Sequence, residues 1–169
     1  MKYIVISDIH GGIENLYKIL DIYRSIKCDK LIILGDLFSY GIDYNKDKII
    51  STLNNFKENI ICVRGNCDNY IEDILFDMPY VLNIHINGYN SLLTHGHLYD
   101  TEYLLNSSND IIMTGHTHRP KIEKINDKLF INPGSITKSR QGPNSFILIT
   151  ESDITIRTLD NEVMETYIF

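Results

Sequence analysis

The length and charge of the chain exclude several classes of protein. Its 169 residues, 43% hydrophobic and 22% charged, suit one globular domain with a full core. The net charge of −6 argues against broad electrostatic binding to nucleic acid or to an anionic membrane, and the 11 tyrosines form no stacking array. Bound metal ions could still create a local cationic site for phosphate. We therefore expect one domain over residues 1–169 with no nucleic-acid platform.

The N-terminus and the cysteines indicate a cytoplasmic protein. The chain runs from Met1 directly into a strand-like segment without a basic and apolar leader, and no apolar run approaches the ~18 residues of a membrane span. The three cysteines lack the spacing of a disulfide framework or a zinc site. We expect Cys28 and Cys62 to be core residues in a reducing compartment.

The first half of the chain alternates strands and helices. Short apolar runs at 3–6, 31–34 and 60–63 predict buried strands. Apolar residues at helical spacing predict a helix over 12–27, and a more polar helix is expected over 45–57. This alternation is typical of βαβ units, so we expect a parallel sheet with helices packed on it.

The second half is richer in hairpins. Segments 80–86 and 89–93 flank Asn87-Gly88, a pair that suits a two-residue type I′ turn. The remaining predicted strands are, in chain order, 111–113, 121–125, 128–131, 146–150 and 154–158. The last four of these should form two further hairpins. We thus expect an α/β fold with a parallel-rich first half and a hairpin-rich second half.

Residues of metal-binding type follow five of the predicted strands, at the point where each strand ends. They are Asp8, His10, Asp36, Asn66, His95, His97, His116 and His118. Because ligands of open α/β sheets bind at the carboxyl ends of the strands, these side chains should converge on one crevice. Turn and capping roles would explain a single Asp or Asn, but not the whole set. The remaining histidine, His85, is expected to be an ordinary sheet residue.

The donor types predict a centre with two metal ions. Carboxylate, amide and imidazole donors suit Mn²⁺, Fe²⁺, Ni²⁺ or Zn²⁺, and the set is too large for one ion with open positions. Two ions about 3.5–4 Å apart can share one carboxylate and clamp phosphate oxygens. Two divalent ions outweigh the charges of Asp8 and Asp36, so the centre would attract a phosphate anion.

Five short motifs resemble, in order and spacing, those of the calcineurin-like metallophosphoesterases. They are Asp8-Ile9-His10-Gly11, Gly35-Asp36, Gly65-Asn66-Cys67-Asp68, Thr94-His95-Gly96-His97 and Gly115-His116-Thr117-His118. The segment 132–135, Asn-Pro-Gly-Ser, further resembles the small bacterial and archaeal phosphodiesterase branch of this family. The resemblance covers nearly the whole chain, and it implies a four-layer α/β/β/α sandwich.

The resemblance also implies a ligand set and a reaction. One metal ion would be held by Asp8, His10, Asp36 and His118, and the other by Asp36, Asn66, His95 and His116. Mn²⁺ is the expected ion, with Ni²⁺, Fe²⁺ and Zn²⁺ as alternatives. A metal-bridging hydroxide would attack the phosphorus of a small phosphate diester without a covalent enzyme intermediate. A phosphomonoesterase with the same site chemistry is the alternative.

The residue after Asn66 departs from the pattern of many family members. They carry His there, whereas this chain carries Cys67, a poor general acid. The small phosphodiesterase branch commonly has Cys at this position, and a packing role for Cys67 is as consistent as a catalytic one. We expect His97 to contact substrate or protonate the leaving group. Arg64 and Asn66 are expected to bind substrate, and Asp68 to orient its neighbours in catalysis.

Two classes other than a small-ester hydrolase remain open. The same fold serves in eukaryotes as a protein-binding scaffold that has lost metal ligands, but here all seven ligand positions are filled. Metal-dependent nucleases also belong to the superfamily, yet this chain is short and acidic. Substrate choice is expected to lie in the loops 39–45 and 69–78, and the C-terminal hairpins are compatible with a homodimer or a higher homo-oligomer.

Overall fold

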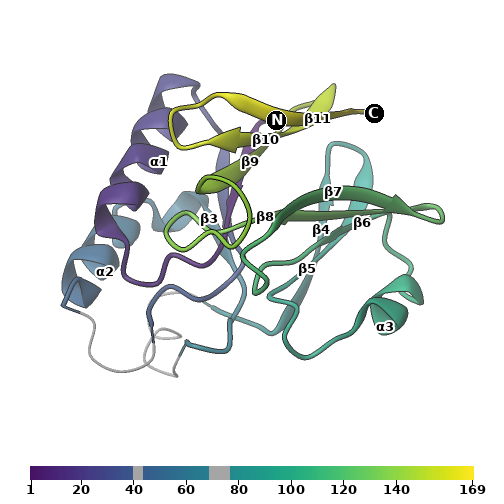
Figure 1. The fold of residues 1–169 in the computed structure, drawn as a ribbon, viewed down its shortest axis with the longest axis horizontal. Helices are drawn as coiled ribbons and strands as arrows, with labels where there is room; N and C mark the ends of the chain where they lie inside the picture. The colour runs from purple at the N-terminus through teal and green to yellow at the C-terminus, as the bar shows by residue number, and fades with distance from the viewer. Residues whose placement is uncertain (40–43, 69–76) are drawn as a thin grey trace.

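In the computed structural model, two mixed β-sheets pack face to face between helices (Figure 1). The structure describes residues 1–39, 44–68 and 77–169. The strands of the first sheet are β1 (Tyr3–Ile6), β2 (Lys30–Ile33), β3 (Ile60–Cys62), β9 (Ser145–Ile149), β10 (Asp153–Thr158) and β11 (Val163–Ile168). Those of the second are β4 (Val81–Ile86), β5 (Tyr89–Thr94), β6 (Ile111–Met113), β7 (Pro120–Ile125) and β8 (Lys128–Pro133). The helices are α1 (Ile13–Ser25), α2 (Lys46–Asn54) and α3 (Thr101–Leu105), with a 3-10 turn at Lys57–Asn59.

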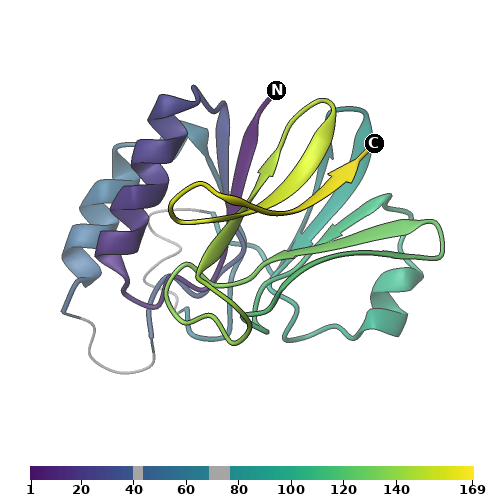
Figure 2. The same ribbon diagram turned by 45° about the horizontal axis from the view of Figure 1, so that its top comes forward.

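The first sheet has the order β11-β10-β9-β1-β2-β3, and its N-terminal part is parallel as predicted. Val5 lies beside Ile32, and Ile33 beside Cys62. Helices α1 and α2 make the crossovers, and Figure 2 shows them running side by side on one face of this sheet. The predicted βαβ arrangement of the first half is therefore confirmed.

The three predicted hairpins form in the second half of the chain, as β4–β5, β7–β8 and β9–β10. The second sheet has the order β4-β5-β6-β8-β7, in which β5, β6 and β8 are mutually parallel. The hairpin β9–β10 leaves this sheet and joins the first one, because β9 pairs antiparallel with β1. The N-terminal strand thus lies in the interior of its sheet, between β2 and β9.

Three hydrophobic cores separate four layers, which confirms the predicted α/β/β/α sandwich. Ile4 and Ile6 point from β1 toward the two helices, whereas Val5 points toward the second sheet. This alternation is the two-residue period of a strand buried on both faces. A smaller third core packs Ile112 and Phe130 beneath α3 on the outer face of the second sheet.

The limits of several elements differ from the sequence prediction. Helix α1 ends at Ser25 because Lys27 adopts a left-handed conformation, with φ of 52°. Two elements were not predicted, namely α3 and β11. Asp100 caps α3 by accepting the Tyr103 N–H at 2.8 Å, a short-range cap that supports only one turn. In the described ranges, no helix has both the length and the apolar character required to cross a membrane.

Cys28 and Cys62 lie in the core beneath the helices, as the sequence predicts. Burial raises the pKa of both thiols, and that of Cys62 well above its usual value. Both side chains therefore act as small core residues.

Replacement of Ile32 tests the contribution of the core between the sheets. Ile32 is fully buried in it, so Ile32→Ala should lower the free energy of unfolding by about 2–5 kcal/mol. Ile168→Ala on β11 is the matched control, because 75% of Ile168 is exposed, and it should change stability by less than about 0.5 kcal/mol. Urea titrations measure both, and equal losses would contradict the importance of this packing.

Candidate metal centre

The structure gathers the predicted ligands at the carboxyl ends of strands from both sheets. In the first sheet, β1 leads into Asp8 and His10, β2 into Asp36, and β3 into Asn66. In the second sheet, β5 leads into His95, and β6 into His116 and His118. Three overlapping groups place donor atoms within 4.8 Å of one another: Asp8, His10 and His118; Asp8, Asp36 and His95; and His10, Asp36 and Cys67. The first sheet supplies the carboxylates, and both sheets supply imidazoles.

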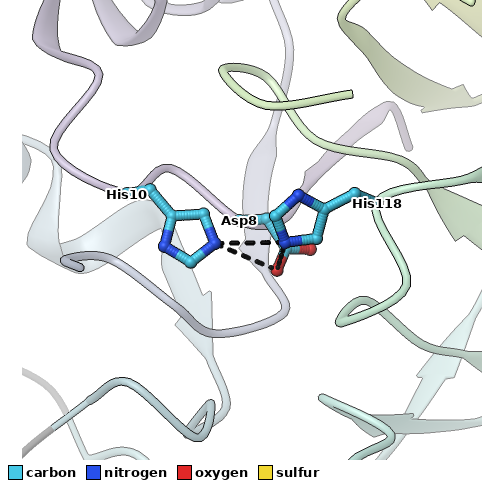
Figure 3. Close-up of side chains that lie close together, drawn as sticks. All are labelled: Asp8, His10 and His118. Carbon is cyan, nitrogen blue, oxygen red and sulfur yellow. Dashed lines mark hydrogen bonds and ion pairs between the residues drawn. The ribbon is translucent and has the colours of Figure 1, made fainter. Parts of the chain in front are cut away.

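Asp8, His10 and His118 form the first of these groups (Figure 3). Oδ1 of Asp8 lies 3.1 Å from Nε2 of His118 and 3.7 Å from Nε2 of His10. The two Nε2 atoms are 3.1 Å apart. All three side chains direct one donor atom to the same point.

The hydrogen bonds of the Nδ1 atoms of His10 and His118 indicate which nitrogen of each ring carries the proton. Nδ1 of His118 bonds to the carbonyl of Lys138 at 2.7 Å, and Nδ1 of His10 to the carbonyl of Phe38 at 3.3 Å. A carbonyl only accepts, so each Nδ1 carries the proton and each neutral ring presents a lone pair at Nε2. Asp8 Oδ1 is buried and receives no hydrogen bond from the described residues. Three lone pairs therefore converge, and a cation is the group that fits between them.

Asp36 connects this group to a second one. Its Oδ2 lies 3.7 Å from Nε2 of His10 and 3.4 Å from Nε2 of His95. Nε2 of His95 is also 3.1 Å from Oδ1 of Asn66, and its Nδ1 is tied to the carbonyl of Leu34 at 2.6 Å. Asp36 thus lies between two donor clusters, which is the position that a bridging carboxylate requires.

His116 lies at the rim of the second cluster. Its side chain is exposed, and its ring centroid is 5.2 Å from that of His95. Its backbone N–H donates to Oδ2 of Asp8 at 3.1 Å, so the same residue also fixes a carboxylate of the first cluster. The predicted set is therefore brought into one site, with His116 the most accessible member.

The charges of the centre favour bound cations. Burial alone would raise the pKa of Asp8, but the nearby imidazole rings of His10 and His118 hold that pKa well below its usual value. Burial alone would lower the pKa of His95, but the nearby Asp36 carboxylate raises it, and the Asp8 carboxylate likewise raises the pKa of His118. The raised pKa values of the two histidines show that the carboxylates favour positive charge at this place, which bound cations would also supply.

The backbone at the centre is strained in a regular way. Left-handed conformations, with φ between 45° and 64°, occur at Asp8, His10, Asp36, His116 and His118. Such residues cost of order 1–3 kcal/mol each and persist only when the surrounding structure holds them. Each sharp turn lets a side chain leave a strand end and point back to the common centre.

Asp68 ties the turn at Asp36 to the loop that follows β3. Its carboxylate accepts the N–H groups of Asp36, Leu37 and Gly65, each at 2.8 Å. Burial raises the pKa of Asp68, while the backbone bonds oppose that rise. The expected orienting role thus takes the form of a clamp between the loops that follow β2 and β3. Gly65 permits this approach, because a Cβ there would lie 2.1 Å from Oδ1 of Asp36.

The segment 132–135 supports the centre from the second half of the chain. Ser135 Oγ donates to the carbonyl of Asp8 at 2.7 Å, and Asn132 Nδ2 donates to the carbonyl of Gly115 at 2.8 Å. The sequence singles out this segment through its resemblance to the small phosphodiesterase branch, but it does not predict these hydrogen bonds. It also missed the carbonyls of Leu34, Phe38 and Lys138, because every residue carries a carbonyl and none gives a sequence signal.

His97, Cys67 and Arg64 lie around the cluster at different depths. The His97 ring is 5.3 Å from that of His95, and its Nδ1 is buried with no hydrogen-bond partner among the described residues. Cys67 is buried, and its N–H donates to Oδ1 of Asp36 at 2.8 Å. Arg64 is also buried, with its guanidinium 5.5 Å over the Tyr80 ring, and Tyr80 lies 6.2 Å from His97. His85 is an exposed residue of β4, away from the site, as expected.

The fold and the centre define a protein of the metallophosphatase class, with two sheets that meet at a cluster of Asp, Asn and His. Residues 1–153 match the calcineurin-like phosphoesterase superfamily domain, and the chain belongs to this family.

Two sequence relatives and two solved structures illustrate the similarity. The chain is 30% identical to phosphodiesterase YfcE of Escherichia coli K12 over 174 residues, which cover 96% of this chain and 94% of the relative. It is 28% identical over 163 residues to phosphodiesterase MJ0936 of Methanocaldococcus jannaschii, with coverage of 89% and 94%. The YfcE structure matches with a TM-score of 0.89 at 28% identity over 99% of both chains. Wild-type Vps29 of Entamoeba histolytica, complexed with Zn²⁺, matches with a TM-score of 0.67 at 26% identity, also over 99% of both chains.

The clamp formed by Asp68 can be tested through metal affinity. Asp68→Asn keeps the shape of the side chain but replaces one acceptor oxygen with an NH₂ group that faces N–H donors, so the Asp36 turn should shift. We expect the affinity for Mn²⁺ to fall by about 10–100-fold, as is usual when a group that orients a ligand is removed. Isothermal titration calorimetry measures this, with Asp160→Asn, an exposed aspartate, as the control. Unchanged affinity in Asp68→Asn would show that the turn holds without the clamp.

Proposed function

We propose that this protein is a metal-dependent phosphodiesterase that hydrolyses small phosphate diesters at a centre of two divalent ions. This proposal rests on the convergence of lone pairs from Asp8, His10 and His118. Asp36 links this group to the cluster of His95 and Asn66. The names of the relatives YfcE and MJ0936, both phosphodiesterases, support the reaction class.

The proposed ligands divide into two sets that share Asp36. One ion would be held by Asp8, His10, Asp36 and His118, and the other by Asp36, Asn66, His95 and His116. Mn²⁺ is the first choice, and Ni²⁺, Fe²⁺ or Zn²⁺ also suit donors of this mixed oxygen and nitrogen type. When bound, the ions would supply Lewis-acid activation of water and neutralise charge on the phosphate.

The protein's own groups would orient the ester and move its protons. His97 lies beside His95, and its ring centroid is 6.2 Å from that of His116. We assign to His97 the protonation of the departing alcohol, a role that imidazole fulfils better than the Cys67 thiol. Cys67 contributes its backbone N–H to Asp36 and fills the turn.

Arg64 would act at longer range. Its buried guanidinium packs on Tyr80, and Tyr80 in turn faces His97, so the positive charge lies one side chain behind the proton donor. We therefore propose that Arg64 attracts the phosphate electrostatically and that Asn66 makes the closer contact. The loops 39–45 and 69–78, which were expected to select the substrate, fall largely outside the described residues.

The first test of the proposed reaction is an aryl phosphodiester assay on metal-stripped protein, with Mn²⁺, Ni²⁺, Zn²⁺ or Mg²⁺ added singly. Activity should return with Mn²⁺ or Ni²⁺, and Asp36→Asn should lower kcat by about 10³-fold or more because both ions lose a shared ligand. Asp160→Asn is the control and should retain wild-type activity.

Other results of this assay would replace the proposal. Faster hydrolysis of monoesters than of diesters would favour a phosphomonoesterase with the same site. If the protein took up no metal ion and bound a partner protein stoichiometrically, it would be a non-catalytic scaffold.

A second prediction concerns the leaving group. Because a proton donor matters most when the departing alcohol is a poor leaving group, His97→Ala should lower kcat for an alkyl ester by about 10²–10⁴-fold and far less for p-nitrophenyl esters. His85→Ala removes an exposed histidine outside the centre and serves as the control. An equal loss for both esters would indicate that His97 binds the phosphate instead.

A further inference from the structure

A cavity of about 710 Å³ borders the metal centre on the outer side of the second sheet. It lies among the loops that follow β5, β6 and β8 and the start of α3. Two of its lining residues, Gly115 and His116, belong to a motif of the metal centre, and Gly96 directly follows His95. The volume falls in the range of roughly 300–1,000 Å³ that is usual for sites of small molecules.

The charge of this cavity is opposite to that of the whole chain. The sequence has 22 acidic and 16 basic residues, yet the described lining contains no Asp or Glu. Its charged members are Arg119, Lys121 and Arg140. A basic cavity in an acidic protein concentrates anions at one place.

Two of these cations are available to a ligand. Lys121 forms an ion pair with Glu123 of the same strand. In contrast, the guanidinium groups of Arg119 and Arg140 make no hydrogen bond or ion pair with any described residue, although both residues are fixed through their backbone N–H groups. Guanidinium remains charged at all physiological pH values and binds carboxylate or phosphate with two parallel hydrogen bonds.

Several other residues that line the cavity are apolar or aromatic, so they suit an uncharged part of a ligand. Tyr99, Leu104 and Phe130 line the cavity, and Leu104 and Phe130 belong to the apolar core beneath α3. A ligand could therefore lay a ring or a short alkyl chain on this surface, with an anionic end near the arginines and its other end at His116.

We propose that this cavity is a subsite for a second anionic group of the substrate, a carboxylate or a phosphate on the alcohol portion of the diester. The inference rests on the proposed function, because it treats the metal centre as the place where the ester is cleaved. It narrows the substrate class from phosphate diesters in general to small diesters that carry a further negative charge.

Binding to metal-free protein tests the subsite without any turnover. The probe is phenylphosphonate, which combines a ring with an anion and cannot be hydrolysed, and the measurement is isothermal titration calorimetry. The double variant Arg119→Gln/Arg140→Gln should bind it about 10-fold more weakly, since each exposed charge pair contributes a factor of up to about 5. Lys124→Gln removes an exposed cation of β7 that does not line the cavity, and it should leave the affinity unchanged.

A matched pair of substrates tests the same subsite during hydrolysis. We expect kcat/KM with Mn²⁺ to be higher for 4-phosphonobenzyl p-nitrophenyl phosphate than for benzyl p-nitrophenyl phosphate. The double arginine variant should lower this ratio about 10-fold, mainly through KM, and Lys124→Gln should preserve it. Thermal unfolding shows whether both variants remain folded.

The outcomes separate the subsite from the proposed reaction. Arginine-dependent binding of phenylphosphonate without hydrolysis of either ester would support the subsite and refute the phosphodiesterase. Hydrolysis of both esters at equal rates, with phenylphosphonate affinity unaffected by the arginine substitutions, would overturn the subsite and leave the phosphodiesterase intact.

Discussion

Two buried carboxylates, Asp8 and Asp36, impose the constraint on which the rest of the structure depends. They are 0% and 2% exposed, and among the described residues their only ion-pair partners are histidine rings. Buried charges without compensation are strongly unfavourable. Backbone N–H groups and imidazoles from both sheets therefore have to reach the same place. The meeting of the sheets, the left-handed turns and the Asp68 clamp all follow from this requirement.

Much of the fold could be predicted because the information is local. Runs such as Tyr3–Ile6 and Ile111–Met113 are apolar on both faces, as strands between two layers must be, and the Asn87-Gly88 pair defines its hairpin. The pairing of β9 with β1 was not predictable, since either sheet offers an edge and only tertiary packing selects one. Strand β11 was missed because it is mostly exposed and lacks the apolar pattern of a covered strand.

The residues of the metal centre likewise divide into those that the sequence identifies and those that it does not. Its side-chain donors were identified because Asp, Asn and His at strand ends are unusual in sequence, and the structure brings them together. The groups that fix those donors were not identified: three are backbone carbonyls, and Ser135 lies far from Asp8 along the chain. The sequence also gives no information on depth: Arg64 was expected to bind substrate, and the sequence did not predict that it is buried with its guanidinium over the Tyr80 ring. The basic cavity also escaped notice, because the loops that line it are separate in sequence.

The interior position of β1 has a consequence for synthesis on the ribosome. Strand β1 emerges before both of its partners; it pairs on one side with β2 but must wait for residues 145–149 before its other edge is covered. The last of the proposed ligands, His118, emerges earlier, yet the Ser135 bond that fixes Asp8 forms only afterwards. A nascent chain that stalls before β9 would therefore expose an apolar strand edge open to intermolecular pairing. Synthesis of β9, rather than capture of an ion, is the step that would cover this edge.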